Sequence, residues 1–105
     1  MAGLTSFKSA LIILMHFKPL PYKVSVRRVS LEPDLFGDCT LKKSGDEYKL
    51  YIRINKDAPE VAQLDALVHE WAHAMLSPIP ALFTTHGPLW GVQYAECYEA
   101  VWEHQ

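Results

Sequence analysis

The sequence predicts a small α+β domain in which one helix precedes a small antiparallel sheet and two further helices follow it. Three observations support this prediction. Apolar residues recur at helical spacing near the start of the chain, alternate with polar residues from Tyr48 to Asn55, and recur at helical spacing again in the second half. The length of 105 residues is that of one domain, which we take to span residues 1–105.

The first helix is predicted from about Thr5 to Phe17. Its apolar positions at helical spacing are Leu4, Phe7, Leu11, Leu14 and Met15. The segment Lys18-Pro19-Leu20-Pro21 ends the helix, because proline lacks an N–H donor and keeps the residue before it out of the helical conformation.

The middle of the chain predicts the strands of the sheet. The segments with strand character are Tyr22–Leu31, the short Cys39–Lys43, and Tyr48–Asn55, where the alternation is clearest. The segments between them have the composition of turns: Glu32-Pro33-Asp34, Phe36-Gly37-Asp38 and Ser44-Gly45-Asp46, the last being typical of a hairpin.

Two helices are predicted after the sheet. In the first, Asp57 can cap the N-terminus, proline and acid suit the first turn, and the apolar pattern continues to about Leu76. Ser77-Pro78-Ile79-Pro80 stops this helix, and a loop of about ten residues follows. The last helix is predicted from about Pro88 to Glu103.

Charge and cysteine content limit the classes of function. All ten Lys and Arg lie between Lys8 and Lys56, whereas the chain from Asp57 onward has seven acidic residues and no Lys or Arg. A basic half can attract nucleic acid, or the two halves can simply form opposite surfaces of one domain. The two cysteines, Cys39 and Cys97, are too few for a disulfide scaffold and lack Cys-x-x-Cys spacing.

No targeting or membrane-spanning segment is predicted. The longest apolar run, Ala10 to Met15, has six residues and no small-x-small cleavage site after it. We therefore expect a soluble, cytoplasmic protein without a membrane partner.

The segment His69-Glu70-Trp71-Ala72-His73 has the pattern His-Glu-x-x-His within the first helix after the sheet. Spacing of four places both imidazoles on one helix face, where they can converge on one cation. Zinc prefers imidazole nitrogen and in catalytic sites keeps one position for water. Glu70 is close enough in the helix to act as general base and acid on that water, which predicts a zinc-dependent hydrolase.

The third ligand remains open at this level. His86 is favoured, since it follows His73 across a Pro-rich loop and directly precedes a helix. Glu96 and Glu99 are the alternatives, because one class of zinc peptidase takes its third ligand from a glutamate on a later helix. The apolar stripe of the last helix places Glu96 nearer to solvent.

The two motifs together resemble the SprT-like zinc metallopeptidases. That family has His-Glu-x-x-His followed by His-Gly-x-x-aromatic, as in His86-Gly87-Pro88-Leu89-Trp90, and the strand containing Arg53-Ile54-Asn55 is also similar. The similarity covers roughly Tyr48 to Val101. It implies a minimal zincin fold, a Zn²⁺ cofactor on His69, His73 and His86, and Glu70 as the catalytic residue.

Other residues have secondary roles in the predicted site. Asp65 lies one turn before His69 and can orient an imidazole or face solvent. Tyr94 and Tyr98 can donate to an oxyanion or belong to the core. His16 and His104 lie outside the predicted site. The strand Tyr48–Asn55 or its neighbour is the expected edge along which an extended peptide binds.

The leading prediction is a zinc metalloendopeptidase acting on a polypeptide substrate. The alternatives are a zinc-containing nucleic-acid-binding or interaction module without proteolytic activity, and a gluzincin-type peptidase with Glu96 or Glu99 as third ligand.

Overall fold

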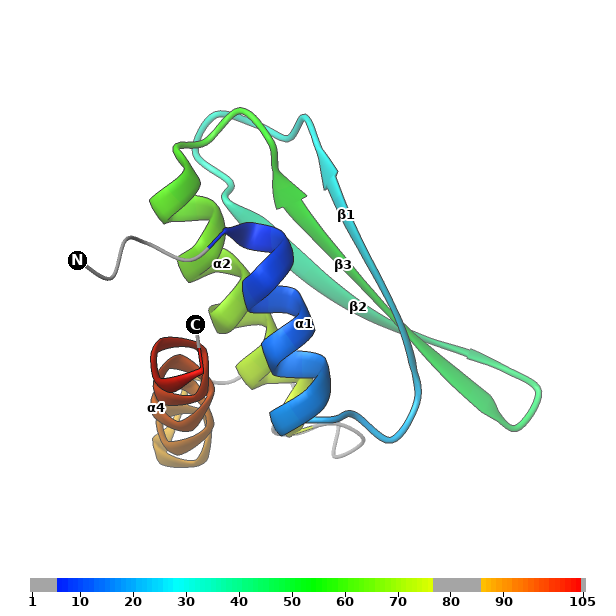
Figure 1. Cartoon of the computed structure of the whole chain (residues 1–105). Coiled ribbons are helices and arrows are strands. Elements are labelled where there is room, and N and C mark those ends of the chain that lie inside the picture. The colour runs from blue at the N-terminus through cyan, green and yellow to red at the C-terminus, as the bar shows by residue number, and fades with distance from the viewer. Residues whose placement is uncertain (1–5, 77–85, 105) are drawn as a thin grey trace.

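The protein folds with its described helices all on one side of a three-stranded sheet (Figure 1). The computed structural model describes residues 6–76 and 86–104. The elements are, in order, α1 (Phe7–Phe17), β1 (Lys23–Val29), β2 (Gly37–Ser44), β3 (Glu47–Asn55), α2 (Glu60–Met75) and α4 (Pro88–Glu103). The α+β class is confirmed.

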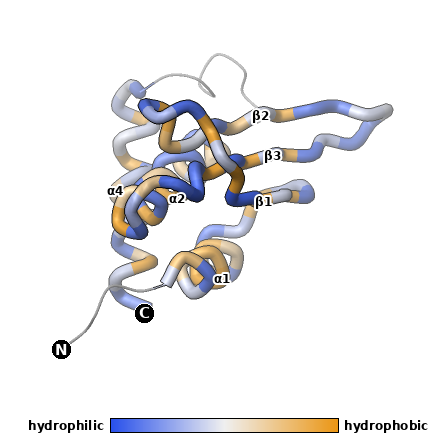
Figure 2. Tube along the Cα trace, turned by 90° about the horizontal axis from the view of Figure 1, so that it is seen from above, coloured by the Kyte–Doolittle hydropathy of each residue, from blue (hydrophilic) through white to orange (hydrophobic). Residues whose placement is uncertain are grey.

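The sheet is mixed, so the prediction of an antiparallel sheet is wrong for one of its two strand pairs. The spatial order is β1-β3-β2: β2 pairs with β3 antiparallel across the hairpin, whereas β1 pairs with β3 parallel. Figure 2 shows this layer from above, separate from the helices.

The apolar content of the strands explains why β3 lies in the centre. Leu50, Ile52 and Ile54 of β3 are at most 1% exposed and form the floor of the core beneath the helices. The inward residues of β1 and β2 are only partly buried. Placing the most apolar strand between two others removes the most apolar surface from water, and this outweighs the adjacency of β1 and β2 in the sequence.

The strand β2 begins earlier than predicted, since the expected turn Phe36-Gly37-Asp38 lies partly within it. Gly37 opposes Ile54 in the ladder, and a Cβ at Gly37 would lie 2.9 Å from the carbonyl oxygen of Arg53. The glycine therefore permits a close approach of two backbones instead of marking a turn. The hairpin turn at Ser44-Gly45-Asp46 is confirmed, with Gly45 at a φ of 63°.

Helix α1 ends at Phe17 as predicted, and Ser6 is its N-cap, with its hydroxyl accepting from the N–H of Ser9. The predicted start at Thr5 and the apolar Leu4 lie outside the described residues. The buried face consists of Phe7, Ala10, Ile13 and Leu14, so Met15, which was expected on it, is exposed instead.

Helix α2 begins at Glu60, and the prediction that Asp57 caps it is wrong. Pro59 occupies the N-cap position without a side-chain bond. The Asp57 N–H instead donates to the Asn55 side chain at 3.0 Å, which closes a turn directly after β3. Glu60 accepts at 3.1 Å from the N–H of Phe7, so its carboxylate joins the starts of the two helices.

Helix α4 has the predicted bounds, with Pro88 in the first turn. It buries Cys97, Ala100 and Val101, whereas Tyr98, expected on the same face, is exposed. The Ser77-Pro78-Ile79-Pro80 stop and the loop after it lie outside the described residues.

Within the described part of the chain, no helix has the length and apolar content to cross a membrane. The two cysteines, Cys39 and Cys97, are not bonded to each other.

Candidate metal centre

Helix α2 carries two of the three histidines of the candidate site. His69 and His73 are one turn apart, so both rings leave the same side of the helix. His73 is 7% exposed and His69 is half-buried, with Trp71 of the same helix buried in the core. The indole of Trp71 donates to the carbonyl of Lys18 at 2.9 Å, which anchors α2 to the end of α1 and helps to fix the position of the histidines.

The third histidine, His86, reaches the first two from the segment that enters α4. Its Nε2 lies 3.0 Å from Nε2 of His73 and 3.1 Å from Nε2 of His69. Gly87, in an extended conformation as the N-cap of α4, and Pro88 start the helix directly after His86. The three residues are 17 positions apart at most, yet their rings face one another.

The arrangement fits a tetrahedral metal ion. One nitrogen from each ring lies within 4.8 Å of the other two. Zn–N bonds of about 2.0–2.1 Å in tetrahedral geometry place ligand nitrogens about 3.3 Å apart, close to the two separations in this cluster. Three imidazoles suit zinc, and also copper, nickel or iron. Among residues 6–76 and 86–104, no other group of three or more His, Cys, Asp or Glu side chains is arranged so that it could hold a metal ion.

Glu70 lies beside the cluster and is 8% exposed. One of its carboxylate oxygens is 4.0 Å from Nε2 of His69. Burial, with a smaller contribution from the negative charge of Asp38, raises the pKa of Glu70 to about 7. A carboxyl group with this pKa exchanges a proton readily near neutral pH, which is what a general acid and base requires.

The glutamates that were considered as third ligands lie elsewhere. Glu96 forms an ion pair with Lys18 at 2.8 Å, joining α4 to the end of α1. Glu99 is exposed and does not belong to the cluster. His16 and His104 are also outside it: the ring of Phe17 contacts both, stacking on His104 at 3.7 Å between ring centroids.

Trp90 supports all three imidazoles. Its ring centroid lies 4.9 Å from that of His69, 5.6 Å from that of His73 and 4.8 Å from that of His86. Its indole N–H also points to the His69 carbonyl, at 3.4 Å. The aromatic position of the second motif is therefore the wall on which the histidine rings rest.

Asp65 and Tyr94 form a pair at the side of the site. The Tyr94 hydroxyl donates to Asp65, and the two rings of Tyr94 and Trp90 are stacked at 4.9 Å. Burial and the Asp65 bond raise the pKa of Tyr94. Burial, with a smaller contribution from His86, lowers the pKa of the His69 imidazole, and the Asp65 carboxylate opposes this shift. The Tyr94 hydroxyl is thus directed to Asp65, not to the histidine cluster.

The histidines and Glu70 line an open cleft of about 290 Å³ whose opposite wall is the start of β2. Gly37, Asp38 and Cys39 form this wall. A second cleft of about 320 Å³, lined by Phe36 among others, shares Gly37, His69 and Glu70 with the first. Burial and the Glu70 charge raise the pKa of the Cys39 thiol, which is therefore protonated at neutral pH and a poor nucleophile.

Sequence reasoning missed this wall. Gly37 and Asp38 were expected to form a turn, and no local pattern links them to a helix about 30 residues later. The sheet order also decides which strand can bind a peptide along its edge. The strand Tyr48–Asn55, which forms most of β3, is paired on both sides. Among the strands of residues 6–76, its neighbour β2 is the one that lies at an edge of the sheet next to the cleft.

Comparisons with known proteins do not bear on this site: no protein-family model matches the chain, and no curated protein or solved structure matches it either.

Proposed function

We propose that the protein is a zinc-dependent metallopeptidase with a minimal zincin-like fold, related to the SprT-like family that its motifs resemble. The observation that carries the proposal is the convergence of His69, His73 and His86 beside the buried Glu70 in an open cleft. The three imidazoles would hold a zinc ion, and that ion would lower the pKa of a bound water toward neutrality and polarise a substrate carbonyl.

Glu70 moves the proton in this reaction. Its carboxylate accepts a proton from the attacking water and passes it to the nitrogen of the leaving amine. The buried position of Glu70 supports this role, because burial raises the pKa of its carboxyl group and makes the carboxylate a stronger base than an exposed glutamate. Trp90 holds the three imidazoles in their relative orientation.

The substrate is an extended polypeptide. Among the described strands, β2 pairs with β3 on one side only, and its first residues line the cleft next to His69 and Glu70. Main-chain pairing along such an edge places a scissile carbonyl over a site without requiring a particular side chain. We assign the protein to the cytoplasm, where its two unbonded thiols would remain reduced.

The experiment compares Glu70→Gln with wild type, both loaded with Zn²⁺, on a fluorescently labelled unfolded polypeptide. The variant should bind zinc to the same stoichiometry, since the substitution removes none of the three imidazole ligands, and should lose hydrolysis by about 100-fold or more. The exposed Glu99→Gln is the matched control and should keep both properties.

Two results would contradict the proposal. One is hydrolysis by Glu70→Gln at the wild-type rate. The other is a zinc-loaded wild-type protein that cleaves no peptide bond in the unfolded polypeptide at any pH between about 6 and 8.

A further inference from the structure

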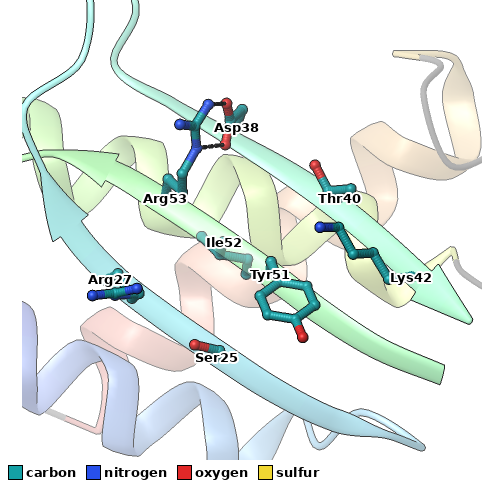
Figure 3. A pocket seen from close by; sticks show the side chains of 8 residues that line it. All are labelled: Ser25, Arg27, Asp38, Thr40, Lys42, Tyr51, Ile52 and Arg53. Atoms are coloured by element: carbon teal, nitrogen blue, oxygen red, sulfur yellow. Dashed lines mark hydrogen bonds and ion pairs between the residues drawn. The ribbon is translucent and has the colours of Figure 1, made fainter. Parts of the chain in front are cut away.

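The outer face of the sheet, turned away from the helices, carries an ordered set of polar side chains (Figure 3). Residues that are paired across the strands share a face of the sheet, so the strand register shows which side chains form rows. Lys23, Lys49 and Lys42 form one such row across β1, β3 and β2. All three are exposed.

Two residues further along the strands, a second row consists of hydroxyl groups. It is made of Ser25, Tyr51 and Thr40 in the same strand order. A third row, again two residues further, contains Arg27, Arg53 and Asp38. We call these three rows the outer platform.

The outer platform has a strong excess of positive charge. Its one carboxylate, Asp38, is engaged by both nitrogens of the Arg53 guanidinium that face it. In the described part of the chain, no carboxylate lies within 4.0 Å of the cationic groups of Lys23, Arg27, Lys42 or Lys49. The nearest acidic residues along the strands, Asp46 and Glu47, lie at the hairpin end beyond the lysine row.

Like charges placed opposite each other on a sheet destabilise it. Three lysines side by side therefore have a cost in the free protein, which a bound polyanion would relieve. The platform is also open to such a ligand: the helices of the described chain pack on the opposite face, and a hollow of about 310 Å³ is lined by residues of the hydroxyl and arginine rows and by Lys42.

Tyr51 adds an aromatic ring to the centre of the platform. The ammonium groups of Lys42 and Lys49 lie 5.3 and 5.2 Å from its ring centroid. Cation–π contacts hold both ammonium groups near the ring. The arrangement combines phosphate-binding cations, hydroxyl donors and a surface on which a base can stack.

We propose that the outer platform binds single-stranded nucleic acid. Two strand spacings make it about 10 Å wide, and rows about 7 Å apart make it about 13 Å long. That area suits about three nucleotides of one extended strand, which four phosphates flank. A base can stack on the Tyr51 ring only when it is unpaired, which favours a single strand over a duplex. Sequence preference is not expected, since the platform offers cations and one ring rather than a set of base-edge partners.

The test uses metal-free protein in EDTA, so its result is independent of the proposed peptidase activity. The probe is a fluorescein-labelled oligothymidylate of about 20 nucleotides, titrated by anisotropy from about 50 to 200 mM KCl. One phosphate contact from each of the four platform cations other than Arg53 predicts a slope of log K against log salt of about −3. The double variant Lys42→Gln, Lys49→Gln should reduce the magnitude of this slope by about 1.4 and weaken binding at low salt about tenfold.

The matched control is Lys8→Gln, Lys56→Gln, which removes the same charge from exposed positions outside the platform and should change affinity less than about twofold. Tyr51→Leu should weaken binding about fivefold or more with an unchanged salt slope, whereas Tyr51→Phe, which keeps the ring, should bind like wild type. Circular dichroism checks that each variant is folded.

Three results would overturn the proposal. The first is equal loss of affinity in the platform and control variants. The second is a duplex of about 20 base pairs, or polyglutamate, that binds as tightly as the single strand. The third is full affinity in a folded Tyr51→Leu, which would leave a surface for phosphate groups alone.

Discussion

Replacing Glu70 by Gln should stabilise the metal-free protein, and the gain should depend on pH. Glu70 is 8% exposed, and burial raises its pKa from an ordinary value of 4.5 to about 7. The folded protein therefore binds this proton more tightly than the unfolded chain does. The stability that Glu70 contributes is fully present below pH 4.5 and is lost as the pH rises through 7.

The size of the effect follows from the pKa difference. A rise from 4.5 to about 7 corresponds to about 3 kcal/mol at pH 8, because each pKa unit represents 1.36 kcal/mol. Gln is a neutral analogue of the protonated acid with nearly the same shape. We expect Glu70→Gln to be more stable than wild type by about 2–3 kcal/mol at about pH 8 and by almost nothing at about pH 4.5. The melting temperature at about pH 8 should rise by about 10 °C.

The assay is urea unfolding in EDTA, followed by tryptophan fluorescence, at several pH values from about 4.5 to 8. Adding Zn²⁺ should shrink the gain, because a cation near the carboxylate favours its charged form. Exposed Glu99→Gln, the control, should change stability by less than about 0.5 kcal/mol. Two results would refute the placement of a buried carboxylate at this site. One is a Glu70→Gln variant that is less stable than wild type at about pH 8. The other is a difference in free energy of unfolding between variant and wild type that is the same at all pH values.

Two further predictions concern the third ligand and the close approach at Gly37. His86→Ala should weaken zinc binding about 100-fold or more, whereas Glu96→Ala should leave it unchanged because Glu96 pairs with Lys18. Competition with a chromogenic chelator measures the zinc affinity of both variants. A larger loss of affinity in Glu96→Ala than in His86→Ala would favour Glu96 as the third ligand. Gly37→Ala should destabilise the fold by about 1–3 kcal/mol, since its Cβ would lie 2.9 Å from a backbone oxygen of β3. Gly91→Ala, in helix α4 with no atom within 4 Å of the added carbon, should instead stabilise the fold by about 0.5–1 kcal/mol. Urea unfolding measures both variants, and a Gly37→Ala variant more stable than Gly91→Ala would contradict the close packing at β2.

Local patterns were sufficient for the elements whose residues interact within one segment. The bounds of α4 and of β3 follow closely from helical spacing and from strict alternation, because each residue's burial is set by its own helix or strand face. The placement of His69 and His73 on one side of α2 has the same origin, since a spacing of four residues and a helical backbone determine it.

Competing local signals led to the errors. Phe36-Gly37-Asp38 has the composition of a turn, yet Gly37 is needed where two strands approach closely. Asp57 has the side chain of an N-cap, yet Asn55 already closes the turn before α2. In both places a contact with a distant or already folded segment replaced the locally favoured structure.

The sequence by itself determined that two imidazoles and a carboxyl group lie within one turn of a helix, because that relation depends only on backbone geometry. The tertiary structure alone decided that His86 meets them, that Glu96 turns to Lys18, and that β2 rather than β3 forms the edge beside the cleft. These relations depend on which apolar faces are buried against each other across the whole chain. Burial of the β3 side chains beneath the helices sets the order of the strands, and that order places both the cleft and the outer platform.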